Sequence, residues 1–227
     1  MHVKKSGDGT SGADTETTAP VVDTTQNEQV TEAPPTEAAT VEPAPQTLQG
    51  SGQQVSGAVN LEEGITVFRM THDGTSNFAI FLLNQSTGEQ VELLVNVIGS
   101  FTGGKAVGIE AAGPYVLDVT ADSNWTVTAE QPRPASAPAA PQAFSGVGQS
   151  VPAPFMLNEG LATFKMTHDG RGNFGIFLLD AEGGLVELLV NEIGPFDGSK
   201  AVSVTGIYSQ PLQESIFWTY RQTGIGR

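Results

Sequence analysis

Apolar and polar residues alternate along much of the chain. In residues 163–168 the even positions hold Phe, Met and His while the odd positions hold Thr, Lys and Thr, and residues 66–72 show a similar order. Side chains of a β-strand point alternately to its two faces, so a period of two indicates a strand with one buried face. Turn residues separate such runs at spacings of roughly 8–12 residues, and we find no 3.6-residue apolar period with helix caps.

The same pattern occurs twice, because the chain matches itself when it is shifted by 96 positions. The motif Thr-His-Asp-Gly at 71–74 recurs at 167–170. After a gap of one residue in a turn, the run Val-Glu-Leu-Leu-Val-Asn at 91–96 recurs at 186–191. Chance does not produce matches of this length, so the sequence predicts two copies of one module.

The composition divides the chain into four segments. Residues 1–47 are rich in Thr, Pro and Ala and carry an excess of acidic side chains, so we expect a disordered tail that buries too little apolar surface to fold. Residues 48–130 form the first copy, and residues 131–143 form a Pro/Ala-rich linker of polyproline type. The second copy covers 144–227. We therefore predict an all-β protein with two tandem antiparallel β-sandwich modules, jelly-roll-like in character.

The two copies differ at their C-terminal ends. The first copy ends in two alternating runs, at 115–120 and 124–128, whereas residues 207–220 show no such alternation. We therefore expect the C-terminal strands of the second copy to be atypical or missing, and we attribute this end to a frameshift or a truncated gene. We also expect that the true start lies upstream and includes an export signal, since residues 1–8 lack one.

Charge and composition exclude several classes of function. The chain has 25 acidic against 10 basic residues, a net charge of −15, which argues against binding nucleic acid or an anionic membrane surface. It has no cysteine, so disulfides and thiolate metal sites are excluded. No apolar run approaches the roughly 18 residues of a transmembrane segment. No Gly-x-Ser-x-Gly or phosphate-binding loop occurs, so we do not expect an enzyme.

Two His-Asp pairs, His72 with Asp73 and His168 with Asp169, stand where a strand meets a turn. Alternation places each histidine on the Phe/Met face, where a neutral imidazole can hydrogen-bond a backbone carbonyl, and each aspartate can accept bonds from nearby turn amides. The same four residues are candidates for binding a ligand or a metal. A His-Asp pair with a distant Asn is, however, not a recognised metal-ligand spacing.

Asparagines at strand ends are the second set of candidate binding residues. Two of them, one in each copy, open a strand. The other two, again one in each copy, close a strand that carries a glutamate on the same face. Amides and carboxylates that converge in this way bind Ca²⁺ or sugar hydroxyls in β-sandwich modules, whereas the alternative is that they satisfy backbone groups in turns. We expect no cofactor, with Ca²⁺ as the one that such a site would take. The residues are Asn77 and Asn173, Asn96 and Asn191, with Glu92 and Glu187.

Three aromatic residues of the first copy, Phe101, Tyr115 and Trp125, could form a platform for stacking sugars. Their apolar neighbours on alternating strands favour the other interpretation, in which they pack in the core.

Several motifs of the repeat also resemble those of a known β-sandwich module. Thr-His-Asp-Gly, Asn-Phe, Leu-Leu-Val-Asn, Ile-Gly-x-Phe, Gly-x-Tyr-x-Leu-Asp-Val and Trp-Thr-Val together resemble a β-sandwich repeat module of uncharacterised bacterial secreted proteins and lipoproteins. More loosely, they are similar to pre-peptidase C-terminal and jelly-roll binding modules. The resemblance implies a β-sandwich fold and an extracytoplasmic setting, and it implies no catalytic residues.

These observations lead us to expect a non-enzymatic binding or spacer protein of the cell envelope or the extracellular space. Its partner would be a cell-wall polysaccharide or another envelope protein, bound by two linked copies of one module. Two alternatives stay open: an accessory segment of a larger secreted protein without a small ligand, and a Ca²⁺-dependent carbohydrate-binding module. A cytoplasmic location is the alternative to export.

Overall fold

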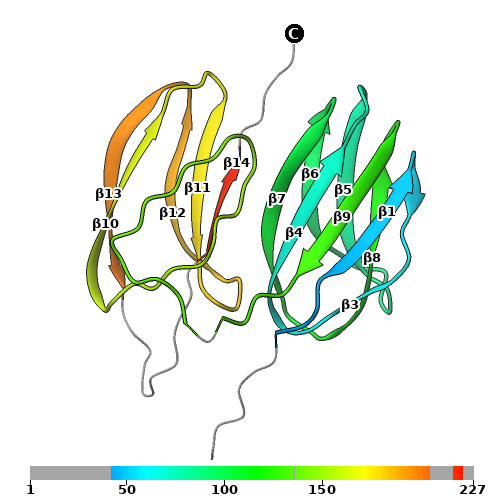
Figure 1. The fold of residues 1–227 in the computed structure, drawn as a ribbon, viewed down its shortest axis with the longest axis horizontal. Coiled ribbons are helices and arrows are strands. Elements are labelled where there is room, and N and C mark those ends of the chain that lie inside the picture. Colours follow the sequence, from blue (N-terminus) through cyan, green and yellow to red (C-terminus); the bar gives the residue numbers. More distant parts are fainter. Residues whose placement is uncertain (1–41, 135, 205–216, 222–227) are drawn as a thin grey trace, which may run out of the picture. The chain divides into compact units, whose positions relative to one another are not determined.

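Antiparallel strands make up the regular structure of this protein. The computed structural model describes residues 42–134 and 136–204 and the backbone of 217–221. Within these ranges the chain forms strands β1 to β14 and no helix, and all strand pairs are antiparallel (Figure 1). This confirms the predicted all-β fold of sandwich type. Most of the predicted tail, 1–41, lies outside the described residues.

Nine strands build the first copy as two facing sheets. One sheet has the order β1-β9-β4-β7, and in the other β2 and β3 pair with β8, which is followed by β5 and β6. The strand β1 begins two residues before the expected boundary at 48. The bounds are β1 (Gln46–Ser51), β2 (Gln54–Val55), β3 (Val59–Leu61), β4 (Gly64–His72), β5 (Asn77–Asn84), β6 (Gln90–Ile98), β7 (Phe101–Ile109), β8 (Gly113–Thr120) and β9 (Asn124–Glu130).

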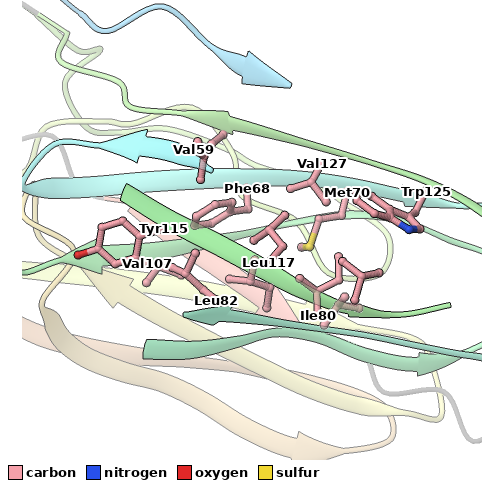
Figure 2. Packing of buried hydrophobic residues seen from close by; sticks show 14 of the residues in the cluster. Val59, Phe68, Met70, Ile80, Leu82, Val107, Tyr115, Leu117, Trp125 and Val127 are labelled. Atoms are coloured by element: carbon pink, nitrogen blue, oxygen red, sulfur yellow. The ribbon is translucent and has the colours of Figure 1, made fainter. Parts of the chain in front are cut away.

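Alternation places the large apolar side chains of both sheets between the sheets. On β4, Phe68 and Met70 are 0% and 1% exposed while Arg69 and Thr71 face outward. Leu117 on β8 meets them from the facing sheet, and Figure 2 shows these side chains interleaved in one cluster. Each such side chain contributes on the order of 1.5–3 kcal/mol when it is fully buried, so this cluster is the main source of stability in the first copy.

Five strands of this plan are found among the described residues of the second copy: β10 (Gly160–His168), β11 (Asn173–Leu179), β12 (Leu185–Ile193), β13 (Phe196–Val204) and β14 (Phe217–Arg221). The strand β10 pairs with β13, and β11 lies between β12 and β14. Ile176 pairs with Tyr220 as Ile80 pairs with Val119 in the first copy, so β14 takes the place of β8.

The strand β14 lies at the end of the second copy, where we expected the C-terminal strands to be atypical or missing. The run Phe-Trp-Thr-Tyr lacks alternation but consists of residues that favour strands, and the edge of β11 supplies the backbone partners. A counterpart of β9 is not found among the described residues of the second copy. The rest of 207–220, and residues 222–227, lie outside the described part of the chain.

Residues that follow β9 are held on the first copy by side-chain hydrogen bonds. The Gln131 side chain is buried and donates to the Glu62 carbonyl at 2.8 Å, and Arg133 donates to the Glu63 carbonyl at 2.7 Å. Further along, the Gln149 carbonyl accepts from the Gly104 amide on β7 at 2.9 Å. Parts of the linker and of the segment after it therefore pack against the sheet that contains β4 and β7.

Candidate functional site

His72 is the best-defined candidate residue, and it is enclosed. It ends β4 with a side chain that is 0% exposed, and its ring stacks on Phe78 with centroids 4.4 Å apart. Its Nδ1 lies 3.0 Å from the carbonyl oxygen of Gly99, which can only accept, so a neutral ring carries its hydrogen on Nδ1. The expected bond to a backbone carbonyl is thus confirmed. Such a ring supports the hairpin turn at Gly99 and offers no open face to a ligand.

Asp122 lies beside the other ring nitrogen and ties two turns together. One carboxylate oxygen lies 3.1 Å from Nε2 of His72, without the alignment of a hydrogen bond. The other accepts the amides of Thr75 and Ser76 at 3.1 and 3.0 Å. The pKa of the Asp122 carboxyl therefore lies below its ordinary value of 3.8, chiefly because of the bond from the Thr75 amide. The turn between β8 and β9 is bound in this way to the turn between β4 and β5.

Asp73 is exposed and turned toward the same neighbouring turn. Its pKa is lowered, first by a hydrogen bond from the Ser123 side chain, and the Asn124 side chain also contributes. The Asn124 carbonyl accepts from the Asp73 amide at 3.3 Å. The sequence predicted bonds to turn amides near Asp73, but the strongest of these contacts comes from a turn fifty residues away. The carboxylate is thus tied to the turn between β8 and β9.

We expect the Asp122→Asn variant to lower the melting temperature at pH 7 by a few degrees, because the Thr75 and Ser76 amides lose a charged acceptor. The folded-state pKa is depressed, so the carboxylate stabilises the fold above pH of about 4, and this contribution is lost as the pH falls through the folded-state pKa. Melting curves from pH 7 to pH 2 should show that the gap in melting temperature between the wild type and the variant closes. Asp118→Asn, an equal charge change on the exposed part of β8, is the control, and a gap that persists at pH 2 contradicts the assignment.

The asparagines of the first copy do not converge with Glu92. Asn77 and Asn96 are exposed diagonal neighbours on β5 and β6, since Asn77 pairs with Ile98 and Ala79 with Asn96. Glu92 lies four residues from Asn96, about 13 Å along the strand, and binds Lys105 at 3.0 Å. The expected cluster of amide and carboxylate is therefore not formed.

The second copy repeats these contacts. The Nδ1 of His168 lies 2.8 Å from the Gly194 carbonyl, and the ring stacks on Phe174 at 4.7 Å. Glu187 binds Lys200 at 2.9 Å, and this lysine holds the pKa of Glu187 below its ordinary value. Asp169 and Asn191 are exposed, and Asn173 is half-buried at the start of β11. The repeated motifs thus match repeated contacts within each sandwich.

The repeated Glu-Lys pair joins the two sheets of each copy. Lys105 projects from β7 and donates to the Leu93 carbonyl on β6 at 2.7 Å, and Lys200 donates to the Leu188 carbonyl at the same distance. Because β6 and β7 lie in different sheets, the lysine closes one side of the sandwich. The structural interpretation accounts for Glu92 and Glu187 without a ligand.

A shallow pocket of about 260 Å³ lies at the end of β4 in the first copy. The buried rings of His72 and Trp125 lie beside it. Its other lining residues carry hydroxyl, amide or carboxylate groups, except for one phenyl ring. They are Thr71, Asp73, Phe101, Thr102, Asn124 and Thr126. Of the polar residues in this second group, the sequence indicated Asp73 alone, and Asn124 and Thr126 lie on β9, which has no matched partner in the repeat.

The aromatic residues lie in the core, as the second interpretation predicted. Trp125 and Tyr115 are 2% and 3% exposed and belong to the main cluster, and Phe101 packs against it. The indole nitrogen of Trp125 donates to the Gly52 carbonyl at 3.1 Å. No exposed stacking platform is formed by these three side chains.

Metal and membrane features can be assessed for the described residues. Among them no group of three or more His, Asp or Glu side chains is placed to hold a metal ion. None of the described segments is a helix long and apolar enough to span a membrane.

Comparison with known proteins identifies no relative of this chain. A scan against protein-family models finds no match, and a search of the curated proteins finds none either.

Proposed function

We propose that this chain is a non-enzymatic binding and spacer protein of the cell envelope or the extracellular space, and that its first copy binds a polysaccharide. The observation that carries this proposal is the pocket at the end of β4, where hydroxyl, amide and carboxylate groups meet at one end of the sandwich. Binding sites commonly combine a rigid scaffold with a few convergent polar groups. Sugar hydroxyls both donate and accept hydrogen bonds, as these side chains do.

The pocket continues into a polar sheet face. On the outer face of β1-β9-β4-β7, Gln49, Thr126, Thr71 and Thr102 follow one another across four adjacent strands. Neighbouring strands are about 4.8 Å apart, so this row presents regularly spaced hydroxyl and amide groups. An extended polymer can lie along such a row while one of its sugar units enters the pocket.

Charge favours a neutral or amino-sugar polymer. The pocket contains the Asp73 carboxylate, which is ionised at neutral pH, and the chain carries a net charge of −15. Both disfavour an anionic polysaccharide. The enclosed His72 supports a non-enzymatic role, because its Nδ1 is engaged by the backbone and its side chain is 0% exposed.

The experiment is a glycan array that includes peptidoglycan fragments, followed by calorimetry with the full chain. We expect saturable binding of a neutral or amino-sugar polymer. Thr71→Val removes a pocket hydroxyl and keeps the side-chain shape, so affinity should fall about 3- to 10-fold. Thr120→Val, on β8 of the other sheet, is the matched control and should leave affinity unchanged.

Two results would overturn the proposal. One is the absence of saturable binding to every polymer tested, which would favour an accessory segment without a ligand. The other is equal binding by the wild type and the Thr71→Val variant, which would place the ligand elsewhere.

A further inference from the structure

The strand β10 differs from its counterpart β4 in what it pairs with. In the first copy β4 lies between β7 and β9. In the second copy β10 pairs with β13, and no described strand pairs with its other edge. The registers agree, since His168 pairs with Phe196 as His72 pairs with Phe101.

The direction of the backbone groups follows from two hydrogen bonds of the first copy. The Asp73 amide donates to the carbonyl of Asn124, the first residue of β9, and the Gly104 amide donates away from β4. Backbone direction alternates along a strand, so Thr71 and Arg69 point their N–H and C=O groups at β9. The register of β10 with β13 is the same. The backbone N–H and C=O groups at the edge of β10 that faces away from β13 are therefore those of Thr163, Lys165 and Thr167.

The side chains of β10 also match those that receive β9. Phe164 and Met166 occupy the positions of Phe68 and Met70, which pair with Ala129 and Val127 of β9. Phe68 is 0% exposed beneath β9, whereas Phe164 is only half-buried. Among the described residues of the second copy, β10 thus presents the acceptor for a strand of the β9 type.

We propose that the edge of β10 binds an extended segment of another polypeptide by adding it as an antiparallel strand. The structure of β9 defines the chemistry of that segment: apolar side chains at alternate positions, three of them, to face His168, Met166 and Phe164. Hydrogen bonds between main chains supply affinity in this mode, and alternate side chains supply specificity. The chain's own β9 is already paired with β1 and β4.

Charge adds a further requirement. Arg69 binds Glu130, near the end of β9, at 3.2 Å, and Lys165 occupies the position of Arg69 in the second copy. A segment with an acidic residue after its third apolar position therefore matches Lys165. Residues 124–130 satisfy each of these conditions.

The test uses the full chain and a fluorescein-labelled synthetic peptide with the sequence of residues 121–131. We expect a saturable, one-to-one rise in fluorescence anisotropy, and slowed hydrogen exchange at the amides of Thr163, Lys165 and Thr167. A peptide that carries Val127→Asp places a charge opposite Met166 and should not bind. Peptide binding at these amides is separate from polysaccharide binding at the first copy.

A backbone variant makes the test specific to the edge. Lys165→Pro removes one amide that faces away from β13 and should weaken peptide binding about tenfold or more, whereas Lys165→Ala keeps the amide and should bind with little change. Circular dichroism checks that both variants keep their strands. The proposal is overturned if the peptide does not bind, if Lys165→Pro binds as well as the wild type, or if the protected amides lie on β4.

Discussion

Replacing Phe68 with alanine is expected to lower the free energy of unfolding of the first copy by about 3–5 kcal/mol. The side chain is 0% exposed and lies in the main cluster with Met70 and Leu117 (Figure 2). The loss combines the transfer energy of the removed atoms with the cavity that remains. Guanidinium unfolding of the full chain, followed by hydrogen exchange and mass spectrometry to resolve each copy, measures it.

Phe164→Ala is the matched control at the equivalent position of the second copy. Phe164 is half-buried and lies at the margin of a smaller cluster, so its truncation should cost clearly less than that of Phe68. Equal losses at both positions would show that β9 does not increase the burial of this phenylalanine. Such a result would also weaken the case for an incomplete acceptor at β10.

A methyl group added at Gly50 is expected to have the second large effect. Gly50 of β1 pairs with Trp125 of β9, and a Cβ at Gly50 would overlap the indole ring and the Gln54 side chain. Trp125 is buried and held by its bond to Gly52, so the ring has no room to move aside. Overpacking of this kind costs about 1–3 kcal/mol, so Gly50→Ala should destabilise the first copy and raise exchange in β1.

Gly146→Ala is the comparison for that variant. Gly146 is the counterpart of Gly50 in the repeat, but among the described residues a Cβ there would meet the Ser150 side chain alone, whose Oγ would lie 2.7 Å from that Cβ and can rotate. Stability should change by less than about 0.5 kcal/mol. If Gly50→Ala proves equally harmless, β1 does not pack against Trp125 as described.

Local pattern was sufficient to predict strands at 66–72, 115–120 and 124–128 and the inward side chains of β4. Alternation identified Phe68 and Met70 as core residues and placed His72 on the same face, where its ring does bond a backbone carbonyl. These features depend on the two-residue period of a strand and on the chemistry of one turn. Neither requires knowledge of which strands are neighbours.

Features that depend on pairing between distant segments could not be predicted. Asp122 escaped notice because it acts on Thr75 and Ser76 through the β4-β9 register, and it has no matched residue in the second copy. Glu92 was grouped with Asn96 because they share a strand, although Lys105 from the facing sheet binds it. The position of β14 within 207–220 could not be read from alternation, because its pairing with β11 makes it a strand.

The strand β9 has two possible pairing partners when the chain folds. Two acceptors, β4 and β10, agree in sequence at Phe, Met, Thr and His, yet the described residues contain one donor strand for both. In refolding from denaturant both acceptors compete for that donor, and repeat proteins commonly misassemble by such exchange. On the ribosome, β9 emerges when β4 is the sole acceptor already synthesised, so the order of synthesis itself selects the correct partner.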